Sequence, residues 1–378
     1  MARLFGTNGI REVVGGPLTA PFVTSVASAI AATVPVGAPI AVGWDGRTSS
    51  PDFARIVSAT LSLAGHSVVE LGLLPTPAVQ YNIPRVGAQF GVIVTASHNP
   101  PEFNGLKCIA GDGLEASRSQ EEAIEAGVER HVVAAAPFAA IGRVHVDSAG
   151  AHRYVEGILA QVDVERIQKR RFTVVLDCGN GASIPTSPQL LRRLGCRVIG
   201  LNTQVDGTFP GHLSEPTEAN LADLKRMVPA VGADLGIAHD GDADRAVFVD
   251  ASGRYVAGEE MLALLERRLD NTVHRLGFAA SRAEARQLVR HGHVQVNGKR
   301  LDIPSYVVRT GDAIALTEGA RKFKFVAAAI AGADKRPPTS WLEADRANFS
   351  GQVKGPPVRE DLNEPEIREQ LVVEYYSR

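Results

Sequence analysis

Short apolar runs and longer amphipathic stretches alternate along the first 150 residues. An apolar run of about 4–8 residues bounded by turn-forming residues is typical of a buried strand, whereas a 3.6-residue repeat is typical of a helix. We therefore expect strands at 39–43, 67–71 and 90–94, a helix that Ser50 caps with Pro51 at its first position, a helix beginning at Thr76, and a helix over 117–131. Residues 104–107 are expected to form a tight turn that leads into a further strand. Strands that alternate with helices indicate a mainly parallel sheet.

The pattern restarts after a predicted helix over about 148–162. Apolar runs predict strands at 172–176, 196–201, 234–238 and 246–250. A helix containing Leu190 and Leu191 follows the first of these strands, and a second helix is predicted over 217–227. The stretch therefore predicts a second α/β unit of similar build.

After Glu266 the alternation ends and arginine becomes frequent. Ser281 and Glu284 form a predicted capping box for a helix that runs to Arg290 and ends at Gly292. Residues 294–301 predict a hairpin on an Asn-Gly turn, and a second strand pair is expected over 304–314. The C-terminal part is therefore expected to be a small α+β domain.

The composition changes this picture little. The chain has 378 residues, of which 44% are apolar and 22% charged, which is ordinary for a globular protein of two or three domains. It contains no apolar run of the roughly 20 residues that span a bilayer, and its first residues lack the apolar centre of a secretion signal. The three cysteines are far apart without metal-ligand spacing. We therefore expect a reduced, cytoplasmic protein with no membrane partner.

The net charge of −2 conceals an asymmetry. Residues 267–378 hold 19 Lys and Arg against 14 Asp and Glu, whereas residues 1–266 hold 21 against 28. The excess is largest over 267–324, with 12 basic and 5 acidic residues. Two partners of opposite character are therefore expected, and the basic part is a candidate for nucleic-acid binding.

The loop after the predicted strand 90–94 carries the first candidate chemistry. Residues 95–100 read Thr-Ala-Ser-His-Asn-Pro and stand at the carboxyl end of a buried strand, where open α/β sheets place their ligands. Ser97 beside His98 could be a nucleophile or a phosphate carrier. The alternative is an ordinary polar transition from strand to loop.

A second, acidic loop follows the predicted strand 234–238. Asp240, Asp242 and Asp244 alternate along it, and their carboxylates can converge only if the backbone curls around a centre. Converging carboxylates repel one another, and a divalent cation relieves that repulsion. Oxygen ligands favour magnesium or calcium, but the glutamate expected of a calcium loop is missing after Asp244. Arg245 could neutralise a phosphoryl group, and the alternative for the whole loop is a solvated turn.

Five short motifs occur in one order: Phe-Gly-Thr-Asn-Gly-Ile-Arg at 5–11, Asp-Gly-Arg-Thr-Ser at 45–49, the serine loop at 95–100, Asn-Gly-Leu-Lys at 104–107 and Asp-Gly-Asp-Ala-Asp-Arg at 240–245. Together they resemble the α-D-phosphohexomutases, closest to the phosphoglucosamine and phosphomannomutase/phosphoglucomutase members. The resemblance covers residues 1 to about 265 and implies two α/β domains with mixed or parallel sheets, 1–150 and 151–252.

The resemblance also implies roles. Ser97 would carry a phosphoryl group that it exchanges with positions 1 and 6 of a hexose or hexosamine phosphate, with a hexose 1,6-bisphosphate as activating donor. Mg²⁺ would be held by the three aspartates and an oxygen of Ser97. The remaining residues would be charge stabilisers or acid/base groups: Arg11, His98, Lys107 and Arg245. The resemblance gives Arg47 a weaker case, because an arginine after a strand is often part of a surface ion pair.

The chain departs from the phosphohexomutase pattern after residue 252. Residues 253–266 read as the opening of a third domain, but the loops by which the third and fourth domains grip sugar hydroxyls and the distal phosphate have no counterpart. Binding energy from remote substrate groups supports the reacting centre. We therefore expect Ser97 to accept phosphate while mutase turnover is impaired, and the sequence does not identify the sugar.

Arg282, Arg286 and Arg290 stand four residues apart, so they share one face of the predicted helix. Such a face suits the phosphate backbone of structured RNA, and the alternative is a solvated helix. Residues 258–378 resemble the RNA-binding part of bacterial ribosomal small-subunit protein four, with further matches at 338–342, 359–361 and 369–378. The resemblance implies ribosomal RNA and small-subunit proteins as partners, and the expected RNA contacts are Arg282, Arg286, Arg290, His291, Lys299 and Arg300.

Three readings of the whole chain remain open. The first is a truncated phosphohexomutase joined at residues 253–266 to an RNA-binding region at 267–378. The second is an RNA-binding, ribosome-associated protein whose N-terminal part is catalytically idle, and the third is a scaffold with neither activity. The segment 258–266 fits the start of both families, which marks it as the seam of a fusion.

Overall fold

The computed structural model describes residues 4–6, 9–333 and 339–357. Contacts divide the chain into two units, Met1–Tyr255 (unit 1) and Val256–Arg378 (unit 2). Unit 1 holds two mixed α/β sheets, and unit 2 holds an antiparallel sheet with helices, so the predicted fold classes are confirmed. No helix in the described residues is long and apolar enough to cross a membrane.

The first sheet of unit 1 has six strands in the order β1-β5-β4-β2-β3-β6. Strands β4, β2, β3 and β6 are parallel to one another. At the other edge, β5 pairs antiparallel with β4, and β1 pairs antiparallel with β5. All three predicted strands in this region are present. The strands are β1 (Ile10–Val13), β2 (Ile40–Trp44), β3 (Val68–Leu73), β4 (Phe90–Val94), β5 (Phe103–Ala110) and β6 (Val144–Val146).

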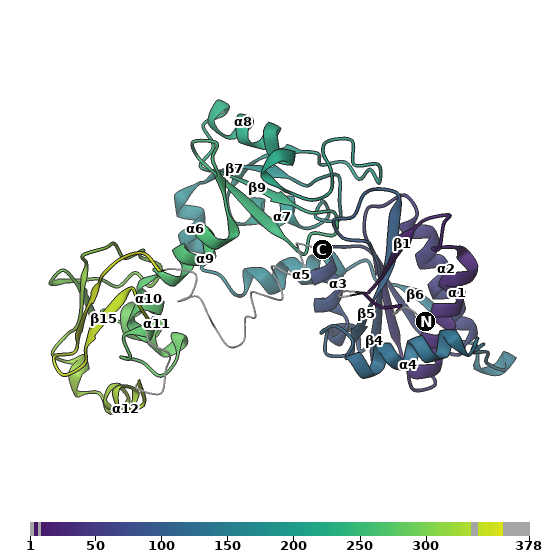
Figure 1. Cartoon of the computed structure of the whole chain (residues 1–378), viewed down its shortest axis with the longest axis horizontal. Coiled ribbons are helices and arrows are strands. Elements are labelled where there is room, and N and C mark those ends of the chain that lie inside the picture. The colour runs from purple at the N-terminus through teal and green to yellow at the C-terminus, as the bar shows by residue number, and fades with distance from the viewer. Residues whose placement is uncertain (1–3, 7–8, 334–338, 358–378) are drawn as a thin grey trace. The chain divides into compact units, whose positions relative to one another are not determined.

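Helices cover both faces of this sheet (Figure 1). On one face α1 (Ala20–Thr33), α2 (Ser50–Leu63) and α4 (Arg118–Glu129) share a core with the sheet. On the other face α3 (Thr76–Asn82) and α5 (Gly150–Leu159) pack over a smaller core.

Two local predictions in this region were wrong. Residues 104–107 are not a turn, because they lie inside β5 and pair with β4 on one side and with β1 on the other. Ser50 does not cap α2, since Ser49 is the N-cap residue and the Ser50 hydroxyl instead donates to Asp45. The two misassigned segments instead bond to each other, since the Asn104 amide donates to the Ser50 hydroxyl at 2.9 Å.

The second sheet of unit 1 has the order β11-β10-β9-β7-β8. Its predicted strands are present, but the predicted helix over 217–227 begins as a 3₁₀ turn, Glu218–Leu221, where the Asn220 amide donates to the Glu215 carbonyl. The elements are α6 (Val164–Arg170), β7 (Thr173–Asp177), α7 (Ser187–Arg193), β8 (Arg197–Leu201), α8 (Ala222–Ala230), β9 (Leu235–His239), β10 (Ala246–Asp250) and β11 (Tyr255–Val256).

Unit 2 is built on an antiparallel sheet of order β13-β12-β14-β16-β15. Its core gathers buried side chains from helices and strands, among them Phe278, Leu288 and Trp341. The elements are α9 (Gly258–Glu266), α10 (Leu269–Arg275), α11 (Arg282–Arg290), β12 (Val294–Val296), β13 (Lys299–Arg300), β14 (Ala313–Leu316), α12 (Lys324–Gly332), β15 (Leu342–Asp345) and β16 (Ser350–Val353).

The hairpin of unit 2 is confirmed. Asn297 and Gly298 both have positive φ, 51° and 76°, as a two-residue turn of type I′ requires. The capping box at Ser281 is incomplete, because the Glu284 carboxylate accepts from the Ala280 N–H instead of the Ser281 N–H.

The predicted strand pair over 304–314 was wrong. The first half of this segment bonds to the start of α10, where Leu269 N–H donates to Tyr306 and Asp270 N–H donates to Pro304. Only the second half continues into a strand, β14, which pairs with β12 and with β16. The sequence similarities proposed at 359–361 and 369–378, and part of those at 5–11 and 338–342, lie outside the described residues.

Candidate active site

The serine loop follows β4, a strand whose five residues are all buried and which lies parallel to β2. Ser97 adopts a left-handed backbone conformation with φ of 52°, which is uncommon for a residue with a side chain. Its N–H donates to the Thr95 hydroxyl at 2.9 Å, so the loop bends back on the end of its own strand. The Ser97 side chain is therefore fixed at the carboxyl end of the sheet and is 2% exposed.

Arg47 holds this loop from the end of the neighbouring strand β2. Its guanidinium donates to the carbonyl oxygens of four loop residues at 2.6–2.9 Å: Ser97, Asn99, Pro100 and Phe103. The side chain is 1% exposed, so the suggestion of a surface ion pair was wrong. The pKa of Arg47 is lowered by burial, and the neighbouring Asp45 opposes this effect.

The four hydrogen bonds from the Arg47 guanidinium are called the Arg47 clamp below. Asp45 connects this clamp to the start of the serine loop. Its carboxylate accepts from Arg47 Nε at 3.1 Å, from Thr95 Oγ1 at 2.7 Å and from Ser50 Oγ at 2.6 Å. Burial raises the pKa of Asp45, and the Arg47 charge and these hydrogen bonds counteract it. Because β2 and β4 are parallel neighbours, their carboxyl ends meet, which is why the two motifs come together.

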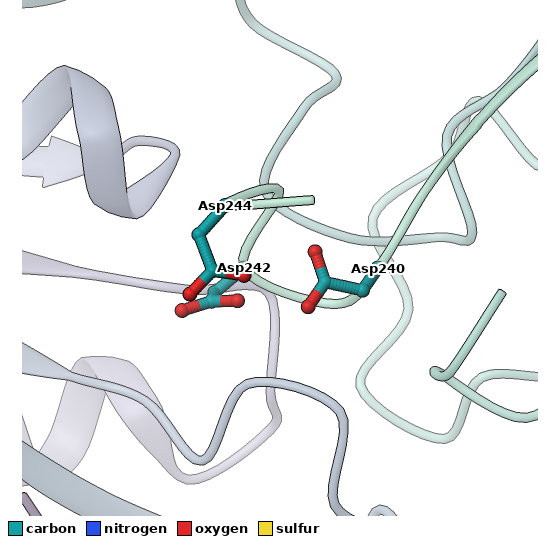
Figure 2. A group of neighbouring side chains, drawn as sticks. All are labelled: Asp240, Asp242 and Asp244. Carbon is teal, nitrogen blue, oxygen red and sulfur yellow. The ribbon is translucent and has the colours of Figure 1, made fainter. Parts of the chain in front are cut away.

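The acidic loop joins β9 to β10 (Figure 2). Figure 2 shows the carboxylates of Asp242 and Asp244 side by side and Asp240 across the bend of the loop. One oxygen of each carboxylate lies within 4.8 Å of the others, and Asp240 and Asp242 are fully buried. The backbone curls as expected, since Ala243 takes a positive φ of 54°.

The acidic loop touches the serine loop directly. Ser97 Oγ donates to Asp240 Oδ2 at 3.2 Å. Gly241 lies against the Ser97 carbonyl oxygen, which would be 2.7 Å from a Cβ at this position. Glycine is therefore required for the loops to approach so closely.

Asp242 has both a firm hydrogen bond and an unsatisfied oxygen. Its Oδ2 accepts from the Thr76 hydroxyl at 2.7 Å, whereas Oδ1 is buried and has no hydrogen-bond partner among the described residues. A buried, unsatisfied carboxylate oxygen beside two further carboxylates matches the ligand set of a hard cation such as magnesium.

The two buried carboxyl groups respond differently to their surroundings. Burial, Asp242 and Asp244 raise the pKa of Asp240 well above its usual range, against the opposing charge of Arg245. Burial would also raise the pKa of Asp242, but Lys107 and the hydrogen bond from Thr76 lower it overall. A bound cation would relieve the repulsion among these carboxylates, which contributes to the raised pKa of Asp240.

The cationic residues expected from the sequence surround the two loops. Lys107 Nζ lies 3.3 Å from Asp244 Oδ2 and 3.8 Å from Asp242 Oδ2. Arg245 Nε donates to Asp240 Oδ2 at 3.0 Å, and Arg11 Nη1 donates to the Asn99 side chain at 3.4 Å.

His98 is the expected acid/base group nearest to the serine. Its Nδ1 lies 3.5 Å from Ser97 Oγ. Burial and the nearby Arg245 lower the pKa of His98. Its imidazole is therefore neutral at neutral pH and can accept a proton.

Three further residues of the site were missed. Ser214 Oγ contacts the carbonyl oxygens of His98 and Asn99 at 2.7 and 2.9 Å, and the Arg47 guanidinium lies 5.2 Å from the ring centre of Phe209. Both belong to an irregular loop with no sequence pattern. Thr76, which binds Asp242, could be identified only as the start of a helix.

The expected RNA contacts in unit 2 divide into two groups. Arg282 donates to Asn271 and Glu266, and Arg286 donates to Asp270 at 3.3 Å, so the first two arginines of the α11 face are engaged by carboxylates of their own unit. The other expected contacts are exposed and form no ion pair with a described carboxylate: Arg290, His291, Lys299 and Arg300.

Comparison with known families agrees with the division of the chain into unit 1 and unit 2. Residues 2–132 match alpha/beta/alpha domain I of phosphoglucomutase/phosphomannomutase, and residues 152–253 match domain II. Residues 267–314 match the S4 domain.

Individual relatives support the same assignment. A phosphoglucomutase/phosphomannomutase from Thermococcus kodakarensis is 38% identical over 70% of this chain and 59% of its own length. A probable phosphoglucosamine mutase from Pyrococcus horikoshii is 36% identical over 78% of this chain and 69% of its own length. A solved phosphoglucomutase/phosphomannomutase family protein from Burkholderia thailandensis superposes with a TM-score of 0.63 at 28% identity, covering 73% of this chain and 60% of that one. The chain spans about 60% of the length of the first relatives it matches.

Proposed function

Because this chain belongs to the phosphoglucomutase/phosphomannomutase family, we propose that unit 1 transfers a phosphoryl group between Ser97 and a hexose or hexosamine phosphate. The supporting observation is the hydrogen bond of 3.2 Å from Ser97 Oγ to Asp240, which is one of the three converging carboxylates. The probable phosphoglucosamine mutases among the relatives favour a hexosamine phosphate as substrate.

In the proposed step, Ser97 Oγ forms a bond to the phosphorus of a sugar bisphosphate while the bond from that phosphorus to the sugar oxygen breaks. The proton of the Ser97 hydroxyl passes to the neutral imidazole of His98, 3.5 Å away, and then to the departing sugar oxygen. The reverse step returns the phosphoryl group to the other end of the sugar. The Arg47 clamp has a positioning role, because it fixes the backbone of the nucleophile without reaching the reacting atoms.

Three aspartates and an oxygen of Ser97 would hold Mg²⁺, which when bound offsets the negative charge of the transferred phosphoryl group. Lys107 lies beside Asp242 and Asp244, and Arg245 lies beside Asp240 and Asp244, so the two cations hold the carboxylates of the acidic loop in place. Arg11 positions Asn99 beside the serine and brings a further positive charge to the loop.

The proposal is restricted to phosphoryl exchange at Ser97. The matches to the mutase domains end at residue 253, and residues 267–314 match the S4 domain. Because the stretch after residue 253 does not continue the mutase match, we expect turnover of a hexose 1-phosphate by this chain to be far slower than in longer relatives.

The test is phosphorylation of the full chain. The chain is first treated with a phosphatase, then incubated with Mg²⁺ and isotopically labelled glucose 1,6-bisphosphate, and phosphopeptides are mapped by mass spectrometry. Label at Ser97 that disappears in Ser97→Ala and Asp242→Ala, but persists in Ser305→Ala, supports the proposal. Absence of label at Ser97 under saturating donor contradicts it.

A second function belongs to unit 2. The S4 match and the exposed basic residues of α11 and β13 favour binding of structured RNA through its phosphates. Gel-shift measurements with a blunt RNA hairpin should show an affinity that falls steeply as salt rises. Replacement of Arg290 and Arg300 by glutamine should reduce that salt dependence, and an unchanged slope would argue against this surface. Ribosomal RNA and small-subunit proteins remain proposed partners.

A further inference from the structure

Unit 2 carries a row of four aromatic rings, of which only His291 is among the RNA contacts expected above. The row runs through His291, His293, Phe323 and Phe325, and joins the start of β12 to the start of α12. In Figure 1, α12 and α11 can be located by their labels within unit 2.

The backbone of unit 2 brings these distant residues together. His293 immediately precedes β12, and its carbonyl oxygen accepts from the Thr317 N–H at 2.9 Å, just after β14. The chain then turns through the 3₁₀ segment Ala320–Lys322 and places Phe323 against His293. The centres of these two rings are 5.0 Å apart with the rings at 87°, an edge-to-face contact.

The row continues outward on both sides. Phe325 stacks on Phe323 with ring centres 5.4 Å apart and an angle of 23°, and His291 lies 6.3 Å from His293. Phe323 packs against the core of unit 2, whereas Phe325 is 39% exposed and His291 is exposed. The inner rings therefore anchor the row, and the outer rings offer it to a ligand.

The charges around the row favour an anionic ligand. Lys322 and Lys324 flank Phe323 in the sequence, and Arg300 donates to the His291 carbonyl at 2.9 Å. All three are exposed, and none forms an ion pair with a described carboxylate. This contrasts with Arg282 and Arg286 of α11, which are held by Glu266 and Asp270.

We propose that this aromatic row stacks unpaired bases of a bound RNA, while Arg300, Lys322 and Lys324 contact the phosphates of the same single-stranded segment. The proposal rests on the RNA binding proposed for unit 2 and extends it from helical RNA to the junction of a helix with a single strand. Stacking on aromatic side chains beside basic residues is a general means of binding unpaired nucleotides. Burial, His291 and Arg300 lower the pKa of His293, which keeps its ring neutral.

The experiment compares two RNA probes on the full chain by fluorescence anisotropy. One probe is a blunt hairpin, and the other is the same hairpin with a short single-stranded uridine tail. The test variant is Phe325→Leu, which keeps an apolar side chain but removes the ring. Phe138→Leu, at an exposed phenylalanine of unit 1, is the matched control.

Wild type and Phe138→Leu should bind the tailed hairpin about five-fold to 100-fold more tightly than the blunt one. Phe325→Leu should lose that preference while its affinity for the blunt hairpin is unchanged, which also shows that the variant is folded. Phe325→Trp should keep the preference. Equal binding of both probes by wild type, or an undiminished preference in Phe325→Leu, overturns the aromatic row and leaves RNA binding by unit 2 intact. Binding of neither probe overturns both.

Discussion

The two units of this chain treat their clustered charges in opposite ways. In unit 1, three carboxylates converge and Lys107 and Arg245 lie beside them, yet Asp242 keeps a buried oxygen with no hydrogen-bond partner among the described residues. In unit 2, Arg282 and Arg286 stand on one helix face, but Glu266 and Asp270 engage both.

This difference shows what makes a charged cluster a candidate for ligand binding. The acidic loop follows the strand β9, and there it holds a buried carboxylate oxygen that no donor among the described residues satisfies. A helix face is open to partners from neighbouring helices, and α10 and the end of α9 provide them for α11. In unit 2, the basic residues that form no ion pair with a described carboxylate are therefore the better candidates for binding a ligand: Arg290, Lys299 and Arg300.

The largest expected effect concerns Arg47, which holds the serine loop of unit 1. Arg47→Lys removes most of the donors that hold four carbonyl groups of the serine loop and leaves Asp45 poorly paired. We expect the free energy of unfolding of unit 1 to fall by about 3–5 kcal/mol, as when a buried ion pair is broken, and labelling of Ser97 to disappear. Urea unfolding of the full chain measures the change.

The matched control for Arg47 is Arg55→Lys, at an exposed ion pair with Asp52. It should change the stability by no more than about 0.5 kcal/mol. Equal unfolding midpoints in Arg47→Lys and Arg55→Lys would show that the clamp does not stabilise the loop.

The next effect concerns the contact between the two loops. A Cβ at residue 241 would stand 2.7 Å from the Ser97 carbonyl oxygen, so Gly241→Ala must displace one loop. We expect a loss of about 1–3 kcal/mol in unfolding free energy and slower labelling of Ser97. Gly332→Ala, in α12 with open space around it, should be neutral or slightly stabilising. Unimpaired labelling of the Gly241→Ala variant would show that the approach of the loops is not needed for the reaction.

A smaller effect concerns Glu266, whose carboxylate engages arginines of unit 2. Glu266→Gln weakens the bonds from Arg275 and Arg282, because an amide accepts less strongly than a carboxylate. We expect unit 2 to lose about 1–2 kcal/mol of stability while its affinity for an RNA hairpin and the salt dependence of binding increase, since Arg282 is released. Glu343→Gln, at an exposed pair with Lys354, is the control and should alter neither quantity. Unchanged RNA binding by Glu266→Gln would exclude competition between Glu266 and RNA.

The smallest effect is a pH dependence within unit 1. His212 Nε2 lies 3.3 Å from Asp177 Oδ2; burial lowers the pKa of His212, but Asp177 raises it overall. The folded state therefore binds this proton more tightly than the unfolded chain, whose histidine pKa is about 6.5. The stability that protonated His212 contributes to unit 1 is fully present below about pH 6.5, the unfolded pKa, and is lost as the pH rises through the pKa of the folded state.

Denaturant unfolding between pH 5 and 8, in steps of about one unit, should show this decline in wild type and a flatter profile in His212→Gln. His145→Gln, at an exposed histidine of β6, is the control and should follow wild type. Parallel profiles for wild type and His212→Gln would remove His212 as the source. The pKa of Asp177 is lowered, because hydrogen bonds and the His212 charge outweigh its burial, so its own contribution is lost only as the pH falls well into the acid range.

The sequence predicted most of the sheet strands in unit 1, because buried strands have a strong apolar signal and their ends carry the reactive loops. It brought Ser97, Asp240, Asp242, Asp244 and Lys107 to one place by motif alone. It did not predict that Arg47 would be buried, since nothing in a single arginine after a strand reports four carbonyl acceptors from a loop fifty residues away. It also failed for residues 304–314, where backbone groups bond to the start of α10 in preference to a strand.

The position of Glu266 determines where a fragment that contains unit 2 should begin. The S4 match begins at residue 267, yet the carboxylate that holds Arg275 and Arg282 is at the end of α9, one residue earlier. A fragment cut at the start of the match would lose that carboxylate and expose two arginines that the intact chain keeps occupied. Such a fragment would no longer present the basic surface of the intact unit 2, so excised fragments should begin no later than Val256.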